Sequence, residues 1–130
     1  NTHNSHYYDG LGIQTAYLGE YVRIDGTQVS GPSLADMVAE ADADLNLEMQ
    51  AKLSNTMMAL GRIKTAAEAG FAYDQMLARG NAGGETLIMG GVDALIDQTR
   101  SIERVVTMLG LDQIAFEGSD SLDAPSAVFQ

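Results

Sequence analysis

Residues 45–67 read LNLEMQAKLSNTMMALGRIKTAA, and their apolar side chains recur at steps of three and four positions. This spacing places them along one face of an α-helix. The members of the face are Leu45, Met49, Leu53, Met57, Leu60, Ile63 and Ala67. A continuous apolar stripe of this kind is typical of the buried seam of a helical bundle. Asp42 and Asp44 are suited to begin the helix, and Gly70 is suited to end it.

A second long helix is predicted at 82–109, followed by Gly110 as its cap. Its apolar stripe comprises Ile88, Val92, Leu95, Thr99, Ile102, Val106 and Leu109. Gly90 and Gly91 lie inside this helix, where each costs roughly 1 kcal/mol relative to alanine. We therefore expect the pair to permit the close approach of another backbone, or a kink.

Three shorter elements are predicted ahead of the long helices. Residues 4–21 fit a helix better than a strand, although three glycines weaken it. Near 21–30, two short β-prone runs flank Asp25-Gly26, a pair favoured in type I′ turns, and this predicts a small β-hairpin connector. A helix at 34–41 follows Ser33, whose spacing to an aspartate three positions later has the form of a capping box.

The remaining segments are a short helix at 71–79 and an extended tail at 111–130. The tail is expected to be held by its apolar residues, which are Ile114, Phe116, Leu122, Val128 and Phe129. No internal repeat or domain linker is visible. We therefore predict an all-α fold, a helical bundle with long amphipathic helices, in which residues 1–130 form a single helical domain.

Composition excludes several classes of function. Eighteen acidic and seven basic side chains give a net charge of −11, which repels a phosphate backbone, so nucleic acid is not expected as a partner. There is no cysteine, so disulfides and thiolate zinc sites are excluded. No apolar run reaches about 18 residues, so no transmembrane segment is predicted.

The chain opens on its densest cluster of chemically active side chains. His3, His6 and Asp9 are spaced by three, which spreads them over an arc of roughly 120° on a helix. Two imidazoles and a carboxylate can bind Fe, Mn or Zn, whereas the alternative is that both histidines are exposed or capping residues. Tyr7 and Tyr8 either present hydroxyls to the same pocket or belong to the core.

A charged cluster lies on the last helix, where Asp93, Asp97, Arg100 and Arg104 follow a 4-3-4 spacing beside Glu103. Either these groups form an ion-paired polar face, or they turn toward the histidines. Asp36, Glu40 and Asp44 form a solvated acidic face by the same spacing. No His-Glu-x-x-His, phosphate-binding loop, EF-hand or nucleophile elbow occurs, so a complete active site is not visible in this chain.

Several strings in this chain resemble the C-terminal half of the imelysin family, the insulin-cleaving metallopeptidase-like, iron-regulated proteins of bacteria. They are NTH (1–3), HYYDGLGI (6–13), YLGEY (17–21), RIDG (23–26), SGPSL (30–34), Phe71, DQM (74–76), DQTRSIE (97–103), LGLD (109–112) and FEGSDSLD (116–123). The resemblance implies a mostly helical two-domain protein, exported to the periplasm or held at the outer membrane, often as a lipoprotein, and linked to iron uptake. The signature Gly-x-His-x-x-Glu belongs to the N-terminal half of the family and does not occur here. We therefore expect the first residue to be an internal position of a longer polypeptide.

The same resemblance implies a ligand pocket shared with the N-terminal half of the same protein. Its candidates here are Asn1, Thr2, His3, His6, Tyr7, Asp97, Arg100 and Glu103, and the metal-ligand candidates are His3, His6 and Asp9. The first hypothesis is a domain that binds a metal, Fe or Zn, or an iron-containing ligand at that junction. The second is a metallopeptidase in which His3 or Arg100 stabilises the oxyanion. The third is a structural half-domain whose polar clusters are solvated or cap helices.

Overall fold

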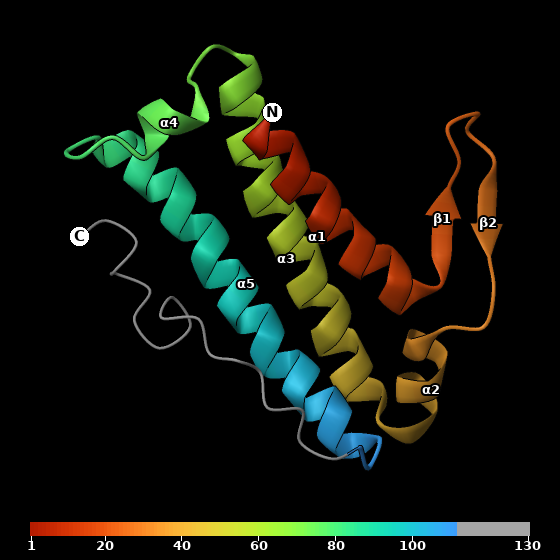
Figure 1. The fold of residues 1–130 in the computed structure, drawn as a ribbon. Coiled ribbons are helices and arrows are strands. Elements are labelled where there is room, and N and C mark those ends of the chain that lie inside the picture. Colours follow the sequence, from red (N-terminus) through yellow and green to blue (C-terminus); the bar gives the residue numbers. More distant parts are fainter. Residues whose placement is uncertain (112–130) are drawn as a thin grey trace.

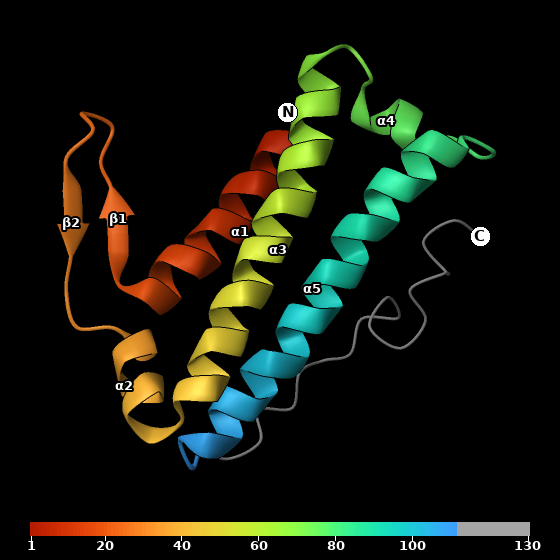
Figure 2. The same cartoon turned by 180° about the vertical axis from the view of Figure 1, so that it is seen from behind.

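The structure is a computed structural model and describes residues 1–111. Three long helices lie side by side in a layer with α3 in the middle, and α2 and α4 lie at its two ends (Figures 1 and 2). A two-stranded antiparallel hairpin stands beside α1. The elements are α1 (Thr2–Leu18), β1 (Glu20–Val22), β2 (Gln28–Ser30), α2 (Leu34–Ala41), α3 (Ala43–Glu68), α4 (Tyr73–Met76) and α5 (Ala82–Met108). The predicted all-α class with one small hairpin is confirmed, whereas the predicted tail and its apolar residues after Leu111 lie outside the described residues.

Helix α1 ends earlier than predicted, at Leu18, because Gly19 adopts a left-handed conformation with φ of 64°. A side chain there is unfavourable for a second reason, since a Cβ at Gly19 would lie 2.7 Å from the Cβ of Ser33. The Gly31 N–H donates to the Gly19 carbonyl at 3.0 Å. These contacts fix the point at which the chain leaves α1 and enters the hairpin.

The hairpin is present, but its turn is not the predicted type I′. That turn needs a positive φ at both central residues, and among the described residues only glycines have one. The Gly26 N–H donates to the Arg23 carbonyl, and the Arg23 N–H donates to the Thr27 carbonyl, each at 2.9 Å. This pattern, with Gly26 at φ 83°, is typical of a three-residue loop that ends in a left-handed glycine.

The helix ends around α3 follow the predicted signals. The Ser33 capping box at the start of α2 is confirmed. Asp42 caps α3 by accepting the Leu45 N–H at 2.9 Å. Past the end of α3, the Gly70 and Phe71 N–H groups donate to the Ala67 and Ala66 carbonyls, the paired bonds of a Schellman motif. The short helix predicted at 71–79 is confined to α4.

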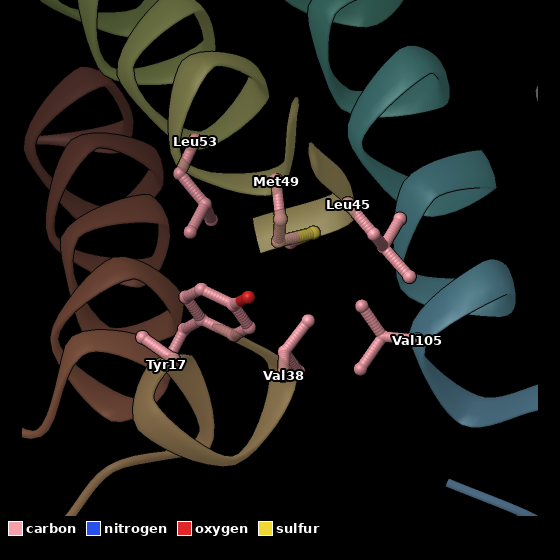
Figure 3. Close-up of a cluster of buried hydrophobic side chains, with 7 residues drawn as sticks. Tyr17, Val38, Leu45, Met49, Leu53 and Val105 are labelled. Carbon is pink, nitrogen blue, oxygen red and sulfur yellow. The ribbon is translucent and has the colours of Figure 1, made fainter. Parts of the chain in front are cut away.

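The apolar stripe of α3 supplies both parts of the core. At one end it meets α1, α2 and α5 in a cluster made of Tyr17, Ala35, Val38, Leu45, Met49, Leu53 and Val105 (Figure 3). At the other end it meets α4 and α5 in a cluster made of Leu60, Ile63, Met76 and Ile88. The predicted stripe is confirmed at five of its seven positions, whereas Met57 and Ala67 are half-buried.

The buried line of α5 differs from the predicted stripe. It comprises Gly84, Ile88, Gly91, Gln98, Ser101 and Val105. Leu95, a member of the predicted stripe, is 37% exposed. The line that faces α3 thus contains small and polar residues, because α3 presents Thr56 and Glu48 there as hydrogen-bonding partners for α5.

Close backbone approach occurs at Gly84 and not at the predicted Gly90-Gly91 pair. A Cβ at Gly84 would lie 2.7 Å from the carbonyl carbon of Met76 and closer still to its oxygen. At Gly91 a Cβ would meet the Cδ1 of Ile63 at 3.1 Å, and at Gly90 it would meet nothing within 4 Å. Gly84 is therefore the residue that lets α4 pack on α5.

Replacing Gly84 with alanine is expected to lower the free energy of unfolding by roughly 1–3 kcal/mol, because the added methyl group overlaps the Met76 backbone. Gly90→Ala is the matched control and is expected to raise it by about 0.5–1 kcal/mol, since its methyl group enters open space. Urea unfolding followed by circular dichroism measures both. Equal shifts in the two variants would contradict the packing of α4 on Gly84.

Candidate functional site

The N-terminal end of α1, which bears both histidines, lies against α4 and the C-terminal part of α3. The His6 ring packs on the Tyr73 ring with 5.5 Å between centroids and 42° between planes. The Lys64 Nζ lies 5.7 Å from the centroid of Tyr7. The structure thus packs the exposed His6 imidazole on Tyr73 and places the Lys64 ammonium over the neighbouring Tyr7.

The predicted ligands His3, His6 and Asp9 do not all share one surface of α1. The face that packs on α3 runs through Tyr7 and Gly10, with His3 half-buried at its start, whereas His6 and Asp9 are exposed. The His3 Nε2 lies 3.3 Å from the Asn4 Nδ2. Within residues 1–111, no group of three or more His, Asp or Glu side chains converges on a point where a metal could sit.

His3 and His6 nevertheless remain neighbours, because side chains three apart on a helix lie about 5–6 Å apart. Neither imidazole takes part in an ion pair among the described residues. Two ligands of a metal centre can therefore come from α1, and no third His, Asp or Glu of residues 1–111 is placed to join them. Asn1 and Thr2 are exposed beside them.

The groups around His6 carry defined charge states. Burial raises the pKa of the Tyr73 phenol, so this side chain is neutral at pH 7. A hydrogen bond to Glu68 raises the pKa of Lys64, which holds the ammonium in its charged form. The carboxylate of Glu68 offsets that charge beside Tyr7, and the His6 ring packs on the neutral phenol of Tyr73.

The charged residues of α5 form a polar seam with α3, made of Glu48, Lys52, Asp97, Ser101 and Arg104. The Lys52 Nζ donates to Asp97 Oδ2 at 2.9 Å, and the Ser101 Oγ donates to Glu48 Oε1 at 2.9 Å. Arg104 pairs with the other oxygen of Glu48. The ion-paired alternative of the sequence analysis is thus present, although its principal partners lie on α3.

Two further predicted residues belong only loosely to the polar seam. Arg100 is exposed and approaches Asp97 at 4.0 Å. Glu103 is exposed, and its backbone carbonyl accepts a hydrogen bond from the Thr107 hydroxyl. Asp36, Glu40 and Asp44 are exposed, in agreement with the predicted solvated acidic face.

The histidines and the polar seam lie at different heights along α3. Lys64 packs on Tyr7, whereas Lys52 binds Asp97. Twelve residues separate these lysines, which corresponds to about 18 Å of helix. Within the described residues, the two groups of pocket candidates are therefore not brought together.

Sequence reasoning missed the α3 members of the seam and the aromatic partner of His6. Glu48 and Lys52 lie far from α5 in sequence, so spacing along one helix could not reveal them. Tyr73 carried no signal beyond its place in a short predicted helix. The one sign in the sequence was that Glu48 and Lys52 stand next to members of the α3 stripe.

The chain is thus a helical protein in which a central amphipathic helix, α3, packs against a first helix that carries both histidines. A small hairpin connects that first helix to the rest. The family model for imelysin, a peptidase family, matches residues 1–102. The chain therefore belongs to the imelysin family. The match ends within α5, so the resemblances noted at 109–112 and 116–123 lie beyond it. No curated protein matches the chain.

The polar seam is expected to make the fold sensitive to acid. Hydrogen bonds from Ser101 and Arg104 lower the pKa of Glu48, and the Lys52 ammonium lowers the pKa of Asp97. A lowered pKa means that the unfolded chain binds protons first, so this stabilisation is present near neutral pH and is lost progressively below about pH 5.

Glu48→Gln is therefore expected to flatten the fall in unfolding free energy between neutral pH and the acid range, measured by urea titration at a series of pH values. Glu103→Gln removes the same charge from α5 outside the seam and serves as the control. If both variants flatten the curve equally, the acid sensitivity does not arise in the seam.

Proposed function

We propose that this chain is the C-terminal helical part of an imelysin-like periplasmic protein, linked to iron uptake, that binds a metal or an iron-containing ligand where it meets its N-terminal half. The observation that carries the proposal is the pair of neighbouring imidazoles on α1, neither of which is used in an ion pair within residues 1–111. Imidazole is a ligand that suits iron and zinc. Family membership supports the same reading.

The incomplete ligand set supports a site at a junction. Protein zinc sites use three or four ligands, and α1 contributes His3 and His6. His6 is exposed on α1, which lies at the edge of the helical layer (Figure 1), so a further segment can reach it. We place the remaining ligands on the N-terminal half of the same protein, with Asp9 and Tyr7 close to the site.

Metallopeptidase activity is the alternative, and a purely structural half-domain is the second alternative. A hydrolytic zinc site requires three protein ligands and an open position for water, so the described residues cannot supply it alone. Binding of a metal or an iron-containing ligand needs no open position for water, and it explains the two neighbouring imidazoles equally well. We therefore prefer the binding function.

Isothermal titration calorimetry with Fe²⁺ and with Zn²⁺, on the chain assembled with its N-terminal half, tests the proposal. The His3→Ala/His6→Ala variant is expected to bind more weakly by at least the roughly 10- to 100-fold that loss of an outer-shell partner costs. Asp44→Asn, at the opposite end of α3, is the control and should bind as the parent does.

Equal affinity in the parent and the double variant would refute the role of the histidines. Chelator-sensitive hydrolysis of peptides by the assembled protein would establish the peptidase alternative. Absence of both binding and hydrolysis would leave the structural half-domain as the function.

A further inference from the structure

A groove of about 340 Å³ runs between α1 and the hairpin. Its apolar lining comes from both elements and consists of Tyr8, Leu11, Leu18, Tyr21 and Val22. Neither histidine and no residue of the polar seam lines it. The groove is therefore separate from the histidines and from the polar seam.

The backbone holds the two walls of the groove in place. One residue, Gly19, separates the end of α1 from the start of β1, and its carbonyl accepts the Gly31 N–H. The same glycine lies against Ser33 at the start of α2, where an added Cβ would come within 2.7 Å of the Ser33 Cβ. The groove is thus a consequence of the chain path and is formed without a ligand.

The groove exposes aromatic surface that a ligand can cover. Tyr8 is 60% exposed and Tyr21 is 55% exposed. The Tyr8 ring makes an edge contact with the Tyr7 ring, with 5.4 Å between centroids. Burial of such surface is favourable at about 25 cal/mol per Å², so the groove favours a partly apolar ligand.

The charge of the lining favours a positively charged ligand. Glu20 is the one charged side chain among the ten residues that line the groove. Tyrosine faces attract cations, and a chain of net charge −11 repels anions. Among residues 1–111, Glu20 takes part in no ion pair, so its carboxylate is available to a cation. Gln14 and Gln28 add amide groups that can accept N–H donors.

The size of the groove selects a small molecule over a protein. A stable protein interface engages about 20–30 residues on each side, whereas ten residues line this groove. Its volume falls at the lower end of the range for small-molecule sites, which is about 300–1,000 Å³. We propose that the groove binds a small organic cation in which an apolar or aromatic body carries an ammonium group close to Glu20.

Phenethylammonium is a suitable probe, with 2-phenylethanol as its neutral analogue and 3-phenylpropionate as its anionic one. Titrations of the full chain followed by ¹H–¹⁵N NMR should give the tightest binding for the cation and the weakest for the anion. Shifts should centre on the residues of the groove. Glu20→Gln is expected to weaken the cation about fivefold and to leave the neutral analogue unchanged.

Gly12→Leu provides a test that does not damage the fold. A Cβ at Gly12 meets nothing within 4 Å, yet Gly12 lines the groove, so a leucine side chain can fill the space that the ligand needs. Binding of phenethylammonium should fall at least tenfold, while the thermal unfolding temperature stays the same or rises. Gly90→Leu, at an equally open position on α5, is the control and should bind as the parent does.

Three results would overturn the proposal. The first is equal binding of all three probes, and the second is undiminished binding in Gly12→Leu. The third is a concentration-dependent dimer in sedimentation equilibrium that Gly12→Leu converts to a monomer, because the groove is then an interface between two copies of the chain.

Discussion

The packing of α3 on its neighbours is the constraint on which the rest of the structure depends. Both other long helices and α2 contact it, so its apolar arc must serve several partners at once. The short helices close the two ends of the layer with fully buried side chains, Val38 from α2 and Met76 from α4. Burial of one such side chain is worth about 1.5–3 kcal/mol, which is enough to hold a short helix that would not be stable alone.

Polar groups between α3 and α5 fix how the two helices align. The Thr56 hydroxyl donates to the Ala94 carbonyl at 3.2 Å, and the Ser101 hydroxyl reaches Glu48. A slip by one turn, about 5.4 Å, would break both of these inter-helix hydrogen bonds, each worth a net of about 0.5–1.5 kcal/mol, whereas an apolar interface loses no such bond. The polar seam thus contributes alignment, while the apolar clusters contribute most of the stability.

The sequence predicts those features that depend on spacing along one element. The α3 stripe, the Ser33 capping box and the end of α3 before Gly70 are of this kind. The α5 stripe was predicted only in part: Ile88 is buried and Val92, Ile102 and Leu109 pack against the core. The buried polar residues Gln98 and Ser101 were missed because they look like surface residues in the sequence. The groove was invisible in the sequence because one wall comes from α1 and the other from the hairpin.

The glycines of α1 show how far packing can override helix propensity. Gly10 and Gly12 weaken the helix on its own, and each has a role that a larger residue would prevent. A Cβ at Gly10 would lie 2.6 Å from the Leu60 Cδ1, so this glycine permits α1 to approach α3. Gly12 contacts no other element at its Cβ position, and the space left by its missing side chain is part of the groove. With His6 exposed beyond the packed face, α1 therefore combines a face for the core, a face that exposes His6 and a face for the groove.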